Sequence, residues 1–305
     1  MKIITNVIDK SRLKDYLKNN IDCLIVGHQS FSSRHGKDFE IDEIRKLKQL
    51  MNENQLLYVS VNQFYNQMQL EELNQYLFEL NKLNVNGILF QDFSIIQLKK
   101  EHNYNFDLIY DPLTLNTNGQ TLNYLKTLGI NSFFLSREIS IKDIREIVKN
   151  DLNLIIQLDG VRHIAQSKRM LVTHYFDTIN QNNSLNQHYI IQPEKTNIKN
   201  YIYEDYYGTH ILSKNRLFSF NVLEQLLFFK ISYGYINGLM MNFEEQIKII
   251  QDYQKAIKLY PSNEYKDFIA TIKLNDSSSD EGFYHDSTIY TLEDVRKRDA
   301  NEKNK

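Results

Sequence analysis

Thiol ligands are almost absent from this chain, whose 305 residues include a single cysteine, Cys23. One cysteine excludes an internal disulfide, a cysteine zinc site and a four-thiolate cluster held by this chain alone. Cys23 lies in the apolar run "IDCLIVG", so we expect it in the core. The sequence also has no Gly-x-Ser-x-Gly elbow and no His-Glu-x-x-His motif. The sequence therefore contains no motif that indicates a protease mechanism or a metal site.

Excess charge and long apolar runs are missing too. The formal net charge is −2, so no global basic field draws the chain to nucleic acid or to an anionic membrane, and such a contact needs a local patch. No apolar stretch approaches the roughly 18 residues that span a bilayer. The start "MKIITNVIDKSRLKD" turns polar too early for a signal peptide. We expect a cytoplasmic protein.

Short apolar runs alternate with amphipathic segments along the chain. Their β-branched and aromatic content, with little internal alternation, is typical of strands buried on both faces. The predicted strands are Lys2–Val7, Asp22–Val26, Leu56–Val61, Gly87–Gln91, Phe106–Tyr110, Ile130–Leu135, Asn153–Leu158 and Gly234–Met240. The helical segments between them include "IDEIRKLKQLMNEN", "LEELNQYLFELNKLN" and "SIKDIREIVKN", the last with Ser140 as a predicted N-cap.

Eight strand–helix units of this kind predict an α/β fold, a TIM-like (β/α)8 barrel, over residues 1–275. A doubly wound open sheet is the alternative, which is disfavoured because no glycine-rich phosphate loop follows the first strand. Residues 159–220 form a long insertion after the seventh strand. Loops after barrel strands lie on the catalytic face, so we expect this insertion to cover the mouth. Residues 276–305 form an acidic linker and a partly disordered tail, in which "GFYHDSTIY" is apolar enough to dock.

Polar residues follow several predicted strands and should meet at the barrel mouth. The candidates for substrate binding there are Arg34, His35, Asn62, Arg137 and Glu138, with Asp92 and Asp111 at the ends of two further strands. An arginine at such a mouth can hold a carboxylate or phosphate through two parallel hydrogen bonds. Each residue alone is more often structural, whereas the set together favours a binding site.

The stretch "DGVRHIAQSKRMLVTHYF" carries two histidines, His163 and His174, and a basic cluster. His163, His174 and His210 match no metal-ligand spacing, and we assign His163 and His210 to the pocket mouth instead. For RNA contact the candidates are Arg162, Lys168, Arg169 and Tyr175, which would hold phosphates and stack a base. A solvated surface is the alternative for this cluster.

The same stretch resembles the signature of the peptidase U32 family, the collagenase-like group, which runs approximately His-Gly-x-x-Cys, six residues, then Cys-Leu-x-Ser-x-Tyr-Phe. "FFLSREISIKDI" resembles the family's Arg-Glu-Leu-Ser segment, and "YEDYYGTHILSKNRL" its Asp-x-x-Gly-Thr-x-x-x-Ser segment. "LIVGHQSFSSRHGKDFEIDEI" is similar to its early arginine loop, and "GFYHDSTIY" to its terminal Gly-Phe…Tyr element. The resemblance covers nearly the whole chain.

The departures from this pattern fall on the family's cysteines. His163, Met170 and Phe218 stand at three cysteine positions, and Asp159 replaces the usual histidine before Gly160. In cluster-bearing members these cysteines are thought to hold a 4Fe–4S centre. Neither methionine nor phenylalanine replaces a thiolate, so we expect no cofactor bound by this chain.

Some members of the family hydroxylate rather than hydrolyse, and the short chain type resembles one of two paralogous subunits that make 5-hydroxyuridine at the tRNA wobble position. The resemblance implies a paralogous U32 partner chain, tRNA, and a small anionic molecule, with prephenate as co-substrate and no membrane contact. Arg34 and Arg137 would bind that molecule. The alternatives are a collagenase-like peptidase, or a non-catalytic partner that stabilises a cluster-bearing paralogue.

Overall fold

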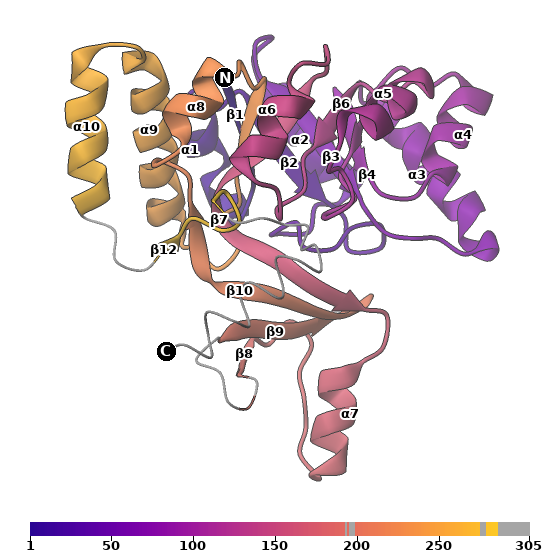
Figure 1. Cartoon of the computed structure of the whole chain (residues 1–305). Helices are drawn as coiled ribbons and strands as arrows, with labels where there is room; N and C mark the ends of the chain where they lie inside the picture. The colour runs from indigo at the N-terminus through magenta and orange to yellow at the C-terminus, as the bar shows by residue number, and fades with distance from the viewer. Residues whose placement is uncertain (193, 195–198, 275–278, 286–305) are drawn as a thin grey trace.

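Eight parallel strands close into a barrel in the computed structural model, which describes all residues except 193, 195–198, 275–278 and 286–305 (Figure 1). Neighbouring strands pair in chain order from β1 to β7, and β11 closes the ring by pairing with both β7 and β1. The barrel strands are β1 (Lys2–Asn6), β2 (Cys23–Gly27), β3 (Leu56–Val61), β4 (Gly87–Phe90), β5 (Asp107–Tyr110), β6 (Ser132–Phe134), β7 (Leu154–Ser167) and β11 (Tyr233–Ile236). This confirms the TIM-like barrel and rules out the open sheet.

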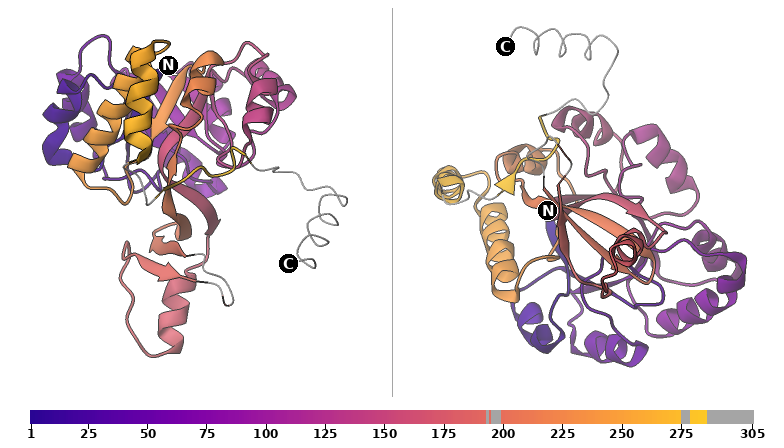
Figure 2. Two further views of the ribbon diagram at one scale, coloured as in Figure 1. Left: turned by 60° about the vertical axis from the view of Figure 1, so that its left-hand side comes forward. Right: turned by 90° about the horizontal axis from the view of Figure 1, so that it is seen from below.

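Helices follow the strands and surround the barrel, as the view along its axis shows (Figure 2). They are α1 (Leu13–Lys18), α2 (Ile41–Leu50), α3 (Leu70–Lys82), α4 (Ser94–His102), α5 (Gly119–Thr127), α6 (Ile141–Ile147), α8 (Leu223–Phe228), α9 (Phe243–Leu259) and α10 (Asn263–Leu274), with short 3-10 helices η1 (Lys10–Arg12) and η2 (Gln67–Gln69). Ser140 is the N-cap of α6, as predicted, and its hydroxyl accepts from the Asp143 amide at 3.2 Å. Such caps satisfy backbone N–H groups that a helix leaves unpaired.

All but two of the predicted strand ends lie within two residues of those in the structure. The eighth strand ends at Ile236 rather than Met240, and Met240 itself has a left-handed φ of 67° that an extended strand does not adopt. The seventh strand does not stop at Leu158 but continues to Ser167, well beyond the barrel. Gly160 makes this possible because it has a φ of 97° and its Cα lies against the Asn237 backbone, where a side chain has no room.

Beyond Gly160 the described residues between 160 and 218 form an arm that stands on the mouth of the barrel (Figures 1 and 2). The outer half of β7 pairs antiparallel with β10 (Gly208–Phe218), which pairs with β9 (Asn200–Asp205), and β9 with β8 (Tyr189–Ile191). Helix α7 (Leu171–Thr178) lies at the far end. Seen along the barrel axis, the arm lies over the centre of the ring (Figure 2).

The core has two parts, one between strands and helices and one inside the barrel. Cys23 belongs to the inner part and is fully buried, as predicted, and burial raises the pKa of its thiol well above the usual value. Most of the predicted linker and tail lies outside the described residues. Of the remainder, β12 (Ser279–Asp280) pairs with β10, and the buried Tyr284 hydroxyl donates to the Gln157 carbonyl at 3.0 Å. Within the described ranges, no helix is long and apolar enough to cross a membrane.

Candidate functional site: a polar cavity at the barrel mouth

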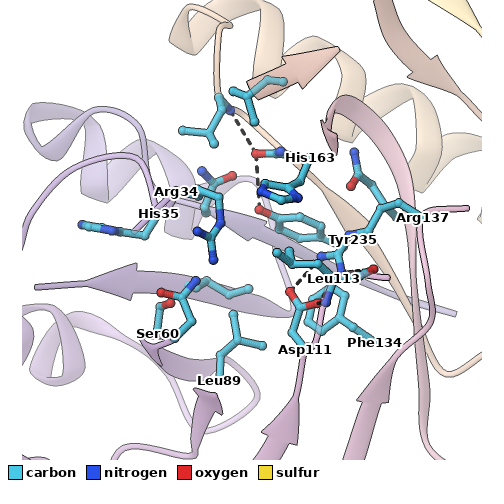
Figure 3. A pocket seen from close by; sticks show the side chains of 17 residues that line it. Arg34, His35, Ser60, Leu89, Asp111, Leu113, Phe134, Arg137, His163 and Tyr235 are labelled. Carbon is cyan, nitrogen blue, oxygen red and sulfur yellow. Dashed lines mark hydrogen bonds and ion pairs between the residues drawn. The ribbon is translucent and has the colours of Figure 1, made fainter. Parts of the chain in front are cut away.

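A cavity of about 50 Å³ lies where the strand ends meet the base of the arm (Figure 3). A single buried water needs roughly 10–15 Å³ of such volume, so the cavity has room for a group of several atoms. Its walls come from seven barrel strands, the loops that follow them and the arm: Asn6, Ile25, Arg34, His35, Ser60, Asn62, Leu89, Asp111, Leu113, Phe134, Arg137, Gln157, His163, Leu212, Tyr235, Asn237 and Leu239. The mouth of a TIM barrel is where its catalytic residues normally lie.

Arg34 reaches into this cavity from the loop after β2. Its backbone has a left-handed φ of 57°, a conformation that costs a non-glycine residue energy and is common at functional sites. One terminal nitrogen donates to the Gln166 side-chain oxygen at 2.7 Å and lies 3.4 Å from His210 Nδ1, so the arm holds the guanidinium. Its Nη2 is buried without a hydrogen-bond partner within the described part of the chain. Burial lowers the pKa of Arg34, which is the least compensated cation of the site.

Arg137, by contrast, already forms an ion pair within the site. It grips the Asp111 carboxylate through both terminal nitrogens, with Nη2 2.8 Å from Oδ2, and its guanidinium lies 4.9 Å from the centre of the Phe134 ring. Burial acts to lower the pKa of Arg137, but the charge and hydrogen bonds of Asp111 outweigh it and raise the pKa above its usual value. The pair is therefore a neutral unit that retains a planar donor face, as bidentate arginine–carboxylate pairs do.

His163 projects from the outer half of β7 toward the two arginines (Figure 3). Burial, together with the charges of Arg34, Arg137 and His210, lowers its pKa to about 2. The imidazole is therefore neutral at physiological pH and carries one donor and one acceptor nitrogen. Both nitrogens are buried and lack a hydrogen-bond partner among the described residues. Buried polar groups are rarely left unpaired, so this ring is placed to meet a ligand or ordered water.

Two more polar groups in the cavity wall share this property. Asn6 Nδ2 and Ser60 Oγ are buried and unpartnered within the described ranges. Together with Arg34 and His163, these groups give the cavity wall several hydrogen-bond donors. The charged residues of the wall are two arginines and one carboxylate. The excess of one positive charge and the surplus of donors suit a small anion, and a carboxylate offers the acceptor oxygens that these donors require.

The other residues predicted for substrate binding have different positions. Asn62 lines the cavity but also clamps the backbone of Ser33 through bonds of 2.9 and 3.1 Å, which fixes the residue before Arg34. His35 lines it too, with Nε2 2.8 Å from Asp38. Glu138 is half-buried and does not line the cavity.

His210 lies behind Arg34 rather than in the cavity wall. Its Nε2 is 2.9 Å from Asp205, and its ring packs on Tyr203 with centroids 5.1 Å apart. Asp92, whose carboxylate accepts from the Tyr65 and Ser94 amides, stabilises a loop. In the described part of the chain, no three His, Cys, Asp or Glu residues gather as a metal site.

Of the four candidates for RNA contact, one is buried and three are exposed. Arg162 is buried, with its guanidinium 3.0 Å from Asp280, so its position does not fit the solvent-facing contact expected for it. Lys168 is exposed and reaches across the mouth to the Phe64 carbonyl at 3.4 Å. Arg169 is exposed beside it, and Tyr175 is 61% exposed on α7. Three of the four are thus available to a partner in solution.

A second, outer cleft of about 330 Å³ adjoins the cavity, and both are lined by Arg34, His35, Leu212 and Leu239. Its remaining wall comes from the loop after β2, the loop after β11, and the arm, which contributes His188, Tyr203, Tyr206 and Tyr207. Sequence reasoning missed these aromatic residues, as it missed Asn6 and Ser60. The signal was the pair Tyr206–Tyr207 before Gly208, an unusual choice for a tight turn.

The model of peptidase family U32 matches residues 9–293. Among curated proteins, tRNA hydroxylation protein P2 of Bacillus subtilis (strain 168) is 28% identical over 283 residues, which cover 87% of this chain and 91% of that protein. The tRNA hydroxylation protein P1 of the same organism is 26% identical over 174 residues, covering 56% of this chain and 41% of P1.

Solved structures give weaker likenesses. A U32 peptidase structure matches with a TM-score of 0.44 at 10% identity, covering 53% of this chain and 70% of that one. Phosphoribosyl anthranilate isomerase from Thermotoga maritima matches with a TM-score of 0.45 at 8% identity, covering 84% of this chain and 99% of that one. Similarity at this level supports no argument about function.

Proposed function

Because this chain belongs to peptidase family U32, we propose that it is a subunit of a tRNA-hydroxylating system that makes 5-hydroxyuridine at the wobble position. The observation that carries the proposal is the likeness to tRNA hydroxylation protein P2 over 87% of this chain and 91% of that protein. The additional likeness to P1 supports a second, paralogous U32 chain as its partner. The alternative of a peptidase is supported only by the name of the family.

The cavity at the barrel mouth would bind the small anionic co-substrate, for which prephenate is the candidate that the resemblance implies. Arg34 would be the principal anion ligand because its Nη2 is unpartnered within the described residues, whereas the charge of Arg137 is matched by Asp111. Arg137 would present its donor face, and His163 would donate or accept one hydrogen bond as a neutral ring. His35 and Asn62 would position the loop that carries Arg34.

We propose that this chain holds no iron–sulfur cluster and that any such centre belongs to the partner. The chemistry of the donor set supports this, since Met170 and Phe218 supply no thiolate and a cluster needs thiolate or imidazole ligands. Two of the positions at which the resemblance implies a cysteine also lie at different heights on the arm. Phe218 pairs with Asp159 at the base of the arm, whereas His163 pairs with Leu212 further out.

The tRNA would contact the exposed side of the arm. Lys168 and Arg169 follow the end of β7, next to the mouth, and would neutralise phosphates there. Tyr175, exposed on α7, would contact the RNA further out. Arg162 is left out of this surface because its guanidinium pairs with Asp280.

The test is mass spectrometry of tRNA nucleosides from the source organism with and without this gene. We expect 5-hydroxyuridine derivatives to disappear on deletion and to return with the wild-type copy. An Arg34→Ala copy should restore less than a tenth of the wild-type level, since loss of a charge-assisted contact costs about 1.5–3 kcal/mol. The control is Arg45→Ala, on the exposed face of α2. Unchanged modification in the deletion strain would refute the proposal, and hydrolysis of gelatin by the pure chain would favour the peptidase instead.

A further inference from the structure

The outer cleft is lined by more aromatic surface than its fold requires. Tyr206 and Tyr207 form the two-residue turn between β9 and β10, because Asp205 pairs directly with Gly208. Two-residue hairpin turns favour Asn and Gly at positive φ, but neither tyrosine has a positive φ. Tyr206 is 70% exposed at the tip. Turn chemistry therefore does not explain these two large rings, whereas contact with a partner would.

A row of rings in tilted contact leads from this cleft toward the cavity. His188 packs on Tyr203 with centroids 4.8 Å apart, and Tyr203 packs on His210 at 5.1 Å. His210 in turn contacts Arg34, which lines both the cleft and the cavity. His188 is exposed overall, but partial burial of its ring lowers its pKa, which favours the neutral form with a flat π face. Flat neutral rings of this kind are what an unstacked nucleobase binds.

Charge at the cleft is balanced rather than basic. Arg34 and Lys37 face Asp38 and Asp205, and the two carboxylates contact His35 and His210. Phosphate attraction therefore adds little in the cleft itself, and stacking must supply most of the binding. A volume of about 330 Å³ is near the lower end of ligand pockets, roughly 300–1,000 Å³, which suits one nucleotide rather than a stacked strand.

We propose that the outer cleft receives a single nucleotide turned out of an RNA loop, whose base stacks on Tyr206 and His188 and whose edge faces Arg34. The inference rests on the proposed function and deepens it, since an enzyme that modifies a base must first take that base out of its stack. The cleft would hold the base next to the cavity, so that the bound nucleotide and the small anion lie on opposite sides of Arg34.

The chain contains no tryptophan, which provides a direct test. Tyr206→Trp keeps a stacking ring and introduces a single tryptophan at the tip. We expect its fluorescence to be quenched by an RNA hairpin with a seven-nucleotide loop and a central uridine. The same hairpin with an abasic residue in place of that uridine should quench much less. Tyr124→Trp, on α5, is the matched control, since Tyr124 is 65% exposed and outside both pockets.

Affinity for the uridine hairpin provides the second readout. Tyr206→Ala should weaken binding about tenfold, since stacking of one base on an aromatic ring contributes this order of magnitude, and Tyr124→Ala should leave it unchanged. The loss should persist at high salt, whereas the effect of Lys168→Ala should fade because phosphate contacts are screened. Equal affinities for the two alanine variants, equal quenching by the abasic hairpin, or no binding at all would overturn the inference. Displacement of the RNA by a gelatin peptide would also overturn it.

Modification in cells separates this inference from the proposed function. In the deletion strain, Tyr206→Trp should restore 5-hydroxyuridine and Tyr206→Ala should restore several-fold less. If modification requires the gene but tolerates Tyr206→Ala, the proposed function stands and the cleft assignment is wrong. If modification does not require the gene, the proposed function fails, and the two fluorescence titrations still decide whether the cleft binds a base.

Discussion

Neutrality of His163 has a measurable consequence for stability. Burial and the nearby positive charges of Arg34 and Arg137 lower its pKa in the folded protein to about 2. An unfolded chain has no such environment, so there the imidazole titrates near its ordinary pKa of about 6.5. Between these two values the unfolded state binds a proton that the folded state does not. Stability must therefore fall as the pH is lowered through this window, because protons favour the state that binds them.

The magnitude follows from the two pKa values of His163. At pH 5.5 the unfolded chain is protonated at this residue about ten times out of eleven, which costs the folded state about 1.4 kcal/mol. At pH 7.5 the same cost is about 0.1 kcal/mol. The difference of about 1.3 kcal/mol is insensitive to the folded pKa, since any value below about 4.5 gives nearly the same result.

Urea unfolding at pH 7.5 and pH 5.5 would measure this cost. Groups other than His163 also contribute to the pH dependence of stability. The comparison is therefore between the wild type and His163→Asn, which removes the titrating imidazole and keeps a polar side chain. We expect the wild type to lose about 1.3 kcal/mol more than the variant. His174→Asn, at an exposed position of α7, is the control and should behave as the wild type does. If the free energy of unfolding of the wild type and of His163→Asn falls by the same amount, His163 is protonated in the folded state and its assigned role as a neutral ligand is wrong.

Two further predictions concern the arm. Glu204→Gln should speed amide hydrogen exchange in α7, because the buried Glu204 carboxylate accepts from two backbone amides at the start of that helix, while Glu71→Gln on α3 should not. Burial acts to raise the pKa of Glu204 but its hydrogen bonds lower it overall, so protection of α7 should weaken as the pH falls through that lowered pKa. Gly160→Ala should reduce the free energy of unfolding by more than Gly129→Ala. Both have positive φ, worth about 1–2 kcal/mol, but only Gly160 also lies against the Asn237 backbone. Equal losses in urea titrations of these two variants would contradict the close approach.

The barrel was predictable because its strands are buried on both faces. Runs such as "CLIVG" and "LLYVSV" are apolar without alternation, and each is followed by a helix with a polar and an apolar face. That pattern depends only on local sequence and on the rule that parallel strands are joined by crossover helices. All eight barrel strands were located in this way, and the two strand ends misplaced by more than two residues are those of β7 and β11.

The arm was not predictable for a physical reason. The outer half of β7 contains exposed residues at Ile164, Ala165 and Gln166, and it reads as a charged loop because its pairing partner, β10, lies some forty residues further along the chain. Antiparallel strands that are partly exposed carry a weak local signal, and their register is set by distant contacts. The same limitation affected Arg162, whose partner Asp280 is 118 residues away. A basic residue on a predicted surface can therefore be a buried one.

Residues at the cavity were found from strand ends, but their roles came only from their partners. Arg34 and Arg137 look equivalent in the sequence, since each follows a strand and precedes a helix. The structure separates them, because Asp111 compensates Arg137 whereas one terminal nitrogen of Arg34 is unpartnered among the described residues. The left-handed backbone of Arg34 gives no signal in a single sequence.

Of the three positions at which the resemblance implies a cysteine, Met170 and Phe218 do not line the cavity, whereas His163 does. Arg34, Asp111 and Arg137 stand on barrel loops, while Met170 lies beyond the end of β7 and Phe218 at the base of β10. We propose that the differences from the family's cysteine pattern at Met170 and Phe218 leave the cavity wall unchanged, since neither residue lines it. His163 belongs to both sets, since it stands at a cysteine position and its ring faces the arginines. A neutral imidazole there keeps a polar group toward the cavity without adding another charge, which agrees with the anion-binding role that we propose for the cavity.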